Sequence, residues 1–157
     1  MTATDPIDQA RRTVLAGLGT LALGLAPVRP ASATAEKMAA AIAAFTGGAV
    51  PVPGRMVLEV ASLVDNGNTV PVTVRVDSPM TASDYVAAIA LFNERNPDTG
   101  IAVFTLGARA GKAEVSTRIR MATSQKLVAV ARMGDNSFRM HSADVVVALA
   151  ACIEGEA

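Results

Sequence analysis

The sequence has very few of the residues that build most cofactor and metal sites. Its 157 residues include one cysteine, one histidine and no tryptophan, and aromatic residues make up only 3% of the chain. One histidine and one cysteine cannot complete a zinc site by themselves. The chain also has no glycine-rich phosphate loop and no G-x-S-x-G nucleophile motif. We therefore expect no cofactor and no bound metal.

The chain also has no excess of charge of one sign. Its 14 basic and 14 acidic residues cancel, and removal of residues 1–35 takes away three basic and two acidic ones, which leaves a net charge of −1. This charge provides no basic footprint for nucleic acid and no polybasic patch for a membrane surface. Hydrophobic residues make up 51% of the chain. The core must therefore consist of aliphatic side chains and methionine, a composition suited to packed β-sheets.

The N-terminus predicts an export signal. Arg11 and Arg12 precede an apolar run of roughly a dozen residues, which is shorter than the 20 or so that a membrane span needs. The arginine pair resembles a twin-arginine (Tat) signal, the bacterial route for folded cargo, and a general secretory signal is the alternative. Small residues predict cleavage just before Thr34 or Glu36. We take residues 1–35 as the cleaved signal peptide and expect a soluble, periplasmic mature protein.

The hydrophobic pattern predicts one helix followed by an all-β domain. Residues 36–45 have apolar side chains at helical spacing and end before two glycines. After an extended connector at 50–54 the apolar period becomes two. Residues 85–93 could form a capped helix, but a strand is favoured. The strands are expected at 56–60, 70–76, 85–93, 101–106, 115–121 and 127–133, with 138–140 and 144–149 completing the sheet. Six or seven short strands indicate an immunoglobulin-like β-sandwich over residues 36–149.

The single cysteine, Cys152, lies five residues from the C-terminus, in a segment (150–157) expected to project from the last strand. In an exported protein a lone thiol is a bystander, an intermolecular link or a reactive group. No cation lies next to Cys152 in the sequence, and Glu154 and Glu156 disfavour the thiolate. The segment therefore fits a passenger thiol, on which other proteins act, better than an enzyme nucleophile.

Several short motifs are spread over nearly all of residues 36–152: AAFTGG at 43–48, DNGNTVPV at 65–72, VDSPM at 76–80, AEVSTRIR at 113–120 and TSQ at 123–125. Together with the twin-arginine signal and the terminal cysteine, these motifs resemble those of SoxY, the sulfur-carrier subunit of bacterial thiosulfate oxidation.

The resemblance implies a carrier that is not itself an enzyme. It implies a heterodimer with a SoxZ-like subunit, a c-type haem enzyme that joins thiosulfate oxidatively to Cys152, and a hydrolase that then releases sulfate. The usual tail of the family is Gly-Gly-Cys-Gly-Gly, whereas here Ala150 and Ala151 precede the cysteine and Ile153 and Glu154 follow it. Fewer glycines make a stiffer and bulkier arm.

Two other readings of the chain are an interaction or assembly β-sandwich with an incidental cysteine, and a thiol-dependent enzyme. Cys152→Ser would abolish the activity of a carrier but would leave binding by an interaction module intact. Turnover of a substrate by the isolated chain would support the thiol-dependent enzyme.

We expect His141 to be structural or superficial. Arg118 and Arg120 are expected on a solvated strand face, with anion attraction or partner contact as the alternative.

Overall fold

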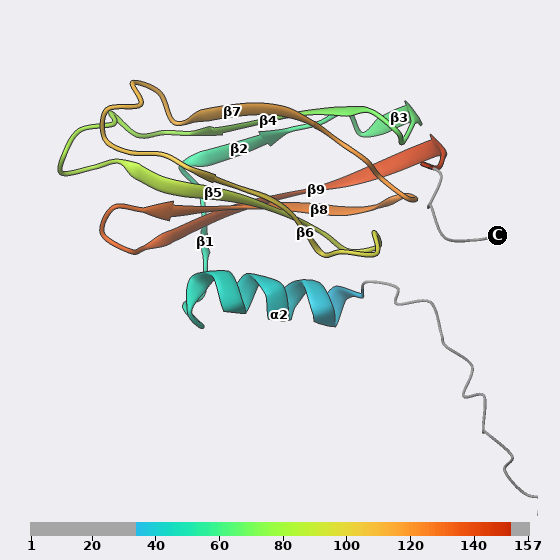
Figure 1. Ribbon diagram of the computed structural model, residues 1–157, viewed down its shortest axis with the longest axis horizontal. Coiled ribbons are helices and arrows are strands. Elements are labelled where there is room, and N and C mark those ends of the chain that lie inside the picture. Colours follow the sequence, from blue (N-terminus) through green and yellow to red (C-terminus); the bar gives the residue numbers. More distant parts are fainter. Residues whose placement is uncertain (1–33, 152–157) are drawn as a thin grey trace, which may run out of the picture. The chain divides into compact units, whose positions relative to one another are not determined.

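The structure, a computed structural model, describes residues 34–151, in which two β-sheets pack face to face and one helix covers the outer face of the larger sheet (Figure 1). The smaller sheet has the order β2-β4-β7 and is antiparallel. Its strands are β2 (Met56–Glu59), β4 (Val70–Val76) and β7 (Glu114–Ile119). In β4 the four valines are buried, whereas Pro71 and Arg75 are exposed, as the period of two predicts.

The larger sheet has the order β1-β9-β8-β5-β6, and β3 also pairs with β9. Its strands are β1 (Val52–Pro53), β3 (Leu63–Asn66), β5 (Val86–Asn93), β6 (Gly100–Thr105), β8 (Gln125–Met133) and β9 (Phe138–Leu149). Strands β5 and β8 are buried at nearly every position. The reason is that one face of these strands packs on the smaller sheet and the other on the helix.

The chain changes sheets between β2 and β3. Strand β2 pairs with β4 in the smaller sheet, whereas β3 pairs in parallel with β9 in the larger one, from Leu63 opposite Val146 to Asn66 opposite Leu149. The two-residue strand β1 pairs with the beginning of β9. One edge of β9 is therefore covered by two separate short strands, and β3 covers the part nearest the C-terminus.

Helix α2 (Ala35–Thr46) begins at a standard N-cap, because the Thr34 hydroxyl accepts a hydrogen bond from the Lys37 backbone N–H at 3.3 Å. A further hydrogen bond from the Thr34 side chain lowers the pKa of Glu36. The helix ends at Gly47, which has the left-handed conformation (φ 64°).

The apolar face of α2 packs on the outer face of the larger sheet through Met38, Ala41, Ile42 and Phe45. The Phe45 ring contacts Phe92 and Phe138 edge-on, with centroids 6.0 Å apart in both pairs. Within residues 34–151, no helix has the length and hydrophobicity needed to span a bilayer.

The predicted β-sandwich with an N-terminal helix is confirmed, and residues 86–93 form a strand as favoured. Two details of the prediction were wrong. Residues 138–140 and 144–149 belong to one continuous strand, because β8 pairs with β9 without interruption from Phe138 to Val145. Strands β1 and β3 were missed because both are short and are defined by their pairing with β9.

Candidate functional site

The structure shows how the chain is held immediately before the predicted sulfur-attachment residue. Cys152 itself lies outside the described residues. Ala150 is exposed, whereas Ala151 is buried, with 6% of its surface exposed. The expectation that the chain projects from Ala150 onward is therefore wrong for Ala151, because this residue packs on the domain. We call the contacts that hold this residue the C-terminal anchor; its members are Gly67, Met121, Leu149 and Ala151.

Three backbone hydrogen bonds connect the anchor. The N–H of Gly67 donates to the carbonyl of Leu149 at 2.8 Å, and the N–H of Met121 donates to the carbonyl of Gly67 at 2.8 Å. The N–H of Ala151 then donates to the carbonyl of Met121 at 3.1 Å. The end of β9 is thus tied to the β3–β4 turn and to the loop after β7. Nearby, the Ser124 hydroxyl accepts a hydrogen bond from the N–H of Val147 at 2.9 Å.

Gly67 is required at its position by close packing. A Cβ at residue 67 would meet the Met121 carbonyl oxygen at a distance that no side chain tolerates, and would lie 2.9 Å from the Ala151 nitrogen and 3.1 Å from Val147 Cγ1. Two of these three neighbours are backbone atoms, which cannot rotate away. The absence of a side chain at residue 67 therefore allows the three segments to meet.

An amide side chain braces the loop that carries Met121. Asn96 Oδ1 accepts hydrogen bonds from the Ala122 N–H at 3.0 Å and from Gln125 Nε2 at 2.7 Å. Asn96 Nδ2 donates to the Arg120 carbonyl at 2.8 Å. Asn96 is therefore bonded to the backbone on both sides of Met121, the residue whose carbonyl holds Ala151.

Two further amides hold the loop that carries Asn96. Asn93 Oδ1 accepts the Asn96 N–H at 2.8 Å, and Asn93 Nδ2 donates to the Asp98 carbonyl at 2.9 Å. Gln125 Oε1 accepts the Arg95 N–H at 2.8 Å. Asn93 is 1% exposed and Gln125 is 6% exposed. Buried amides are stable only when hydrogen-bonded, so this network specifies one arrangement of both loops.

The anchor can position a chain, but it contains no acid, base or metal ligand. All of its hydrogen bonds join neutral amide groups of the backbone. Among residues 34–151, no group of three or more His, Cys, Asp or Glu side chains could hold a metal ion.

Lys126 and Asp144 form an ion pair at 2.8 Å beside Gln125, whereas the other ion pairs among residues 34–151 lie farther from the anchor. Arg55 pairs with Asp84 at 2.7 Å, and this hydrogen bond raises the pKa of Arg55. Arg75 pairs with Glu114 at 3.0 Å and also with Glu59, and these hydrogen bonds raise the pKa of Arg75. These pairs are solvent-exposed and contribute little to stability.

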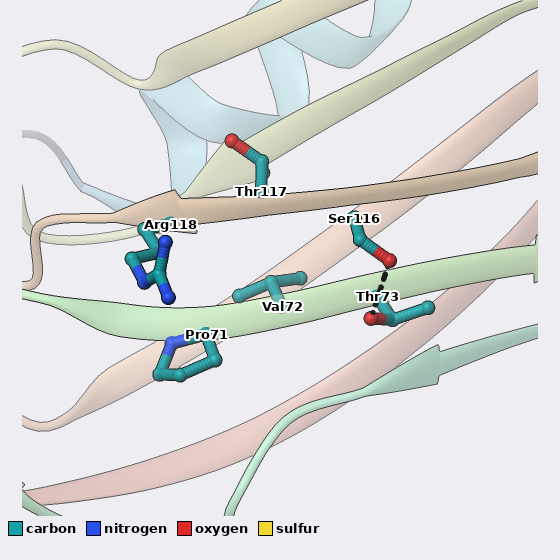
Figure 2. Close-up of a pocket in the computed structure, with 6 residues that line it drawn as sticks. All are labelled: Pro71, Val72, Thr73, Ser116, Thr117 and Arg118. Carbon is teal, nitrogen blue, oxygen red and sulfur yellow. Dashed lines mark hydrogen bonds between the residues drawn. The ribbon is translucent and has the colours of Figure 1, made fainter.

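A shallow depression on β4 and β7 is the other candidate binding surface. It is lined by residues 71–73 and 116–118, and Figure 2 shows Arg118 beside Pro71 and the Thr73–Ser116 hydroxyl pair, whose oxygens are 2.9 Å apart. Arg118 is the only charged residue among those that line it, and Arg120 is exposed just beyond the end of β7. Both arginine side chains are exposed, as expected for either a solvated face or a surface that contacts a partner or an anion.

His141 is structural. Its Nδ1 accepts a hydrogen bond from the Leu58 backbone N–H at 3.1 Å, which joins β9 to β2.

Sequence reasoning missed Gly67, Asn96 and Gln125 as parts of the site. The one local signal was the turn-rich composition around Gly67 and Asn96, which indicates loops but not their partners.

The geometry defines a class of protein, namely a β-sandwich that anchors a short C-terminal segment bearing its single cysteine. A family model, "Sulfur oxidation protein SoxY", matches residues 42–152. A solved structure of the sulfur carrier protein SoxY from Chlorobium limicola f thiosulfatophilum is 30% identical. That comparison covers 72% of this chain and 93% of the other, with a TM-score of 0.61.

The chain belongs to the SoxY family of sulfur oxidation proteins. The predicted family is confirmed. Membership in it supports the prediction that the protein is a carrier subunit rather than an enzyme. A search of curated proteins found no significant match.

Superoxide reductases share the fold alone. The one from Ignicoccus hospitalis is 14% identical with a TM-score of 0.54, and the match covers 60% of this chain and 80% of the other. The one from Nanoarchaeum equitans is 13% identical with a TM-score of 0.51, and the match covers 61% of this chain and all of the other.

Proposed function

We propose that this protein is an exported sulfur carrier of thiosulfate oxidation, which holds sulfur intermediates covalently on the Cys152 thiol and presents them to partner enzymes. The observation that carries the proposal is the extent of the family match. It begins at residue 42 and ends at residue 152, and so includes the only cysteine of the chain at its last position. The similar solved structure is itself described as a sulfur carrier.

The proposed chemistry requires partners at each step. In the first step, a bond forms between Cys152 Sγ and the sulfane sulfur of thiosulfate, the thiol loses its proton, and two electrons pass to a c-type haem enzyme. In the second step, a hydrolase adds water across the bond between the sulfane sulfur and the sulfonate, which releases hydrogen sulfate and leaves a persulfide on Cys152. The anchor offers neutral amides only, so the base, the oxidant and the activated water come from the partners.

The protein is proposed to reach the periplasm by the Tat route and to form a heterodimer with a SoxZ-like subunit. The arginine pair at residues 11 and 12 supports the route. Cleavage before Thr34 is favoured over cleavage before Glu36, because Thr34 caps α2 and would be lost with the second cut.

Mass measurement of the native protein tests the carrier function. The protein is purified from thiosulfate-grown cells, and its intact mass is taken before and after a reductant. We expect reductant-sensitive adducts of sulfur and thiosulfate that map to Cys152 and are absent from Cys152→Ser. A bare thiol during active thiosulfate oxidation would contradict the carrier function and favour the interaction module with an incidental cysteine. Co-purification of a second, SoxZ-like chain tests the heterodimer separately.

A further inference from the structure

We propose that Asn96 is a positioning residue for the sulfur-carrying arm. Asn96 bonds to the backbone on both sides of Met121, and the Met121 carbonyl holds Ala151, which directly precedes Cys152 in the chain. The inference rests on the proposed function, since an arm needs positioning only if Cys152 carries sulfur. Asn96 is far from Cys152 in the sequence, yet by this proposal it decides where the arm leaves the domain.

The first step of the argument is that Asn96 holds the Met121 loop in one conformation. Its side chain uses both ends of the amide, because Oδ1 accepts from Ala122 and Gln125 while Nδ2 donates to Arg120. A carbonyl bonded on one side and an N–H bonded on the other leave the intervening peptide units little freedom.

The second step is that the direction of the Met121 carbonyl decides whether Ala151 is held. Met121 is fully buried, and its own N–H is bonded to the Gly67 carbonyl. With the loop fixed at both flanks, the Met121 carbonyl points at the Ala151 N–H at 3.1 Å. Because Gly67 lacks a side chain, nothing separates Ala151 from this carbonyl.

The third step concerns reach. A residue that follows a fixed residue starts about 3.8 Å from it, the spacing of consecutive Cα atoms. With Ala151 held, the residue directly before Cys152 is still bonded to the domain, so we expect the domain to hinder the reaction of a bulky reagent with the thiol more than that of a small one. With Ala151 released, the arm lengthens by the residues back to the end of β9. The anchor therefore favours small reactants and close-fitting partners.

The isosteric variant Asn96→Asp tests the inference in the exported, mature protein. Its carboxylate keeps the acceptors for Ala122 and Gln125, but it cannot donate to the Arg120 carbonyl and repels it. The matched control is Ser78→Ala. The Ser78 hydroxyl donates to the Asp84 carbonyl and accepts from the Met80 N–H in the β4–β5 loop, at the opposite end of the sheets from the anchor (Figure 1). This control also loses a side chain–backbone brace but leaves the anchor intact.

Two readouts report the anchor directly. The first is hydrogen exchange of the Ala151 amide, and we expect its protection to fall about fivefold in Asn96→Asp, the effect of losing one hydrogen bond. The second is the ratio of Cys152 reaction rates with a polyethylene-glycol maleimide and with a small aromatic disulfide. We expect this ratio to rise about fivefold. Ser78→Ala should change neither readout.

Ala151→Pro provides a second route to the same state, since proline lacks the N–H that donates to Met121. It lies after the last strand, so the sheets fold even if Asn96→Asp does not. We expect the same rise in the rate ratio. An unchanged ratio in Ala151→Pro, or unchanged Ala151 protection in folded Asn96→Asp, would overturn the inference while leaving the carrier function standing. Loss of the carrier function would instead appear as the absence of sulfur adducts on the wild-type protein, whatever the state of the anchor.

Discussion

The Nδ1 atom of His141 on β9 accepts a hydrogen bond from the backbone N–H of Leu58 on β2, over 3.1 Å. This contact joins an edge strand of the smaller sheet to the larger sheet. His141 lies on β9 between the residues that pair with β1 and those that pair with β3. At this position the His141 imidazole, rather than a neighbouring strand, satisfies the Leu58 N–H on the edge of β2.

Replacement of His141 should therefore destabilise the fold without affecting sulfur chemistry. We expect His141→Leu to lower the free energy of unfolding by about 1–3 kcal/mol, because the Leu58 N–H loses its acceptor. His141→Asn places an amide oxygen near the position of Nδ1, so its free energy of unfolding should fall by less. Urea unfolding of both variants measures the difference. Equal stability of wild type and His141→Leu would contradict the structural role.

Gly67 should not tolerate even a methyl group. We expect Gly67→Ala to cost about 1–3 kcal/mol, the usual penalty for overpacking, because the new Cβ would meet the backbone of Met121 and Ala151. The matched control is Gly107→Ala, since a Cβ there has no heavy atom within 4 Å. Thermal unfolding of the two variants makes the comparison. The prediction is wrong if both variants unfold at the same temperature.

The β8–β9 turn should respond to acid through Asp135. Hydrogen bonds from the Ser137 hydroxyl and the Ser137 N–H, the latter at 2.8 Å, hold the pKa of Asp135 below its ordinary value. A carboxyl whose folded-state pKa is lowered stabilises the fold above the unfolded-state pKa. It loses this contribution as the pH falls through the folded-state pKa.

Asp135→Asn keeps an acceptor for Ser137 but removes the charge. We expect this variant to be less stable than wild type at neutral pH and to approach wild type as the pH falls below about 3.9, the unfolded-state value for aspartate, and through the lower folded-state pKa. The effect should be modest because the group is exposed. Melting temperatures measured across this range provide the test. Asp98→Asn removes the same charge elsewhere on the exposed surface. A similar pH profile for that variant would count against a specific role for Asp135.

The export signal makes a prediction about the mature N-terminus. We expect the exported protein to begin at Thr34, so that α2 keeps its N-cap. The pair Arg11→Lys and Arg12→Lys should abolish export if the route is Tat, since that pathway depends on the arginine pair. N-terminal sequencing of the periplasmic protein identifies the cleavage site, and an N-terminus at Glu36 would contradict the predicted cleavage before Thr34. Unimpaired export of the double-lysine variant would indicate the general secretory route.

Strands whose pattern is strictly local were predictable from the sequence. The four valines of β4 recur every second residue, and that spacing alone places them on one face of a strand. Strand β9 was predicted as two pieces because polar residues at 141, 142 and 144 interrupt its apolar pattern. Pairing with β8 along the whole segment overrides that interruption, since the backbone ladder does not depend on side-chain polarity.

The sequence by itself determined the alternating strands, the helix that ends before two glycines, the lack of a metal-ligand motif and the position of the single cysteine. Each of these depends on residue types or on spacings of a few residues. Only the tertiary structure decided the C-terminal anchor. The Asn96 side chain bonds to residues 24 to 29 positions away, and Gly67 joins the ends of β7 and β9. These contacts exist because the two sheets bring distant turns to the same end of the sandwich, an effect that no local pattern encodes.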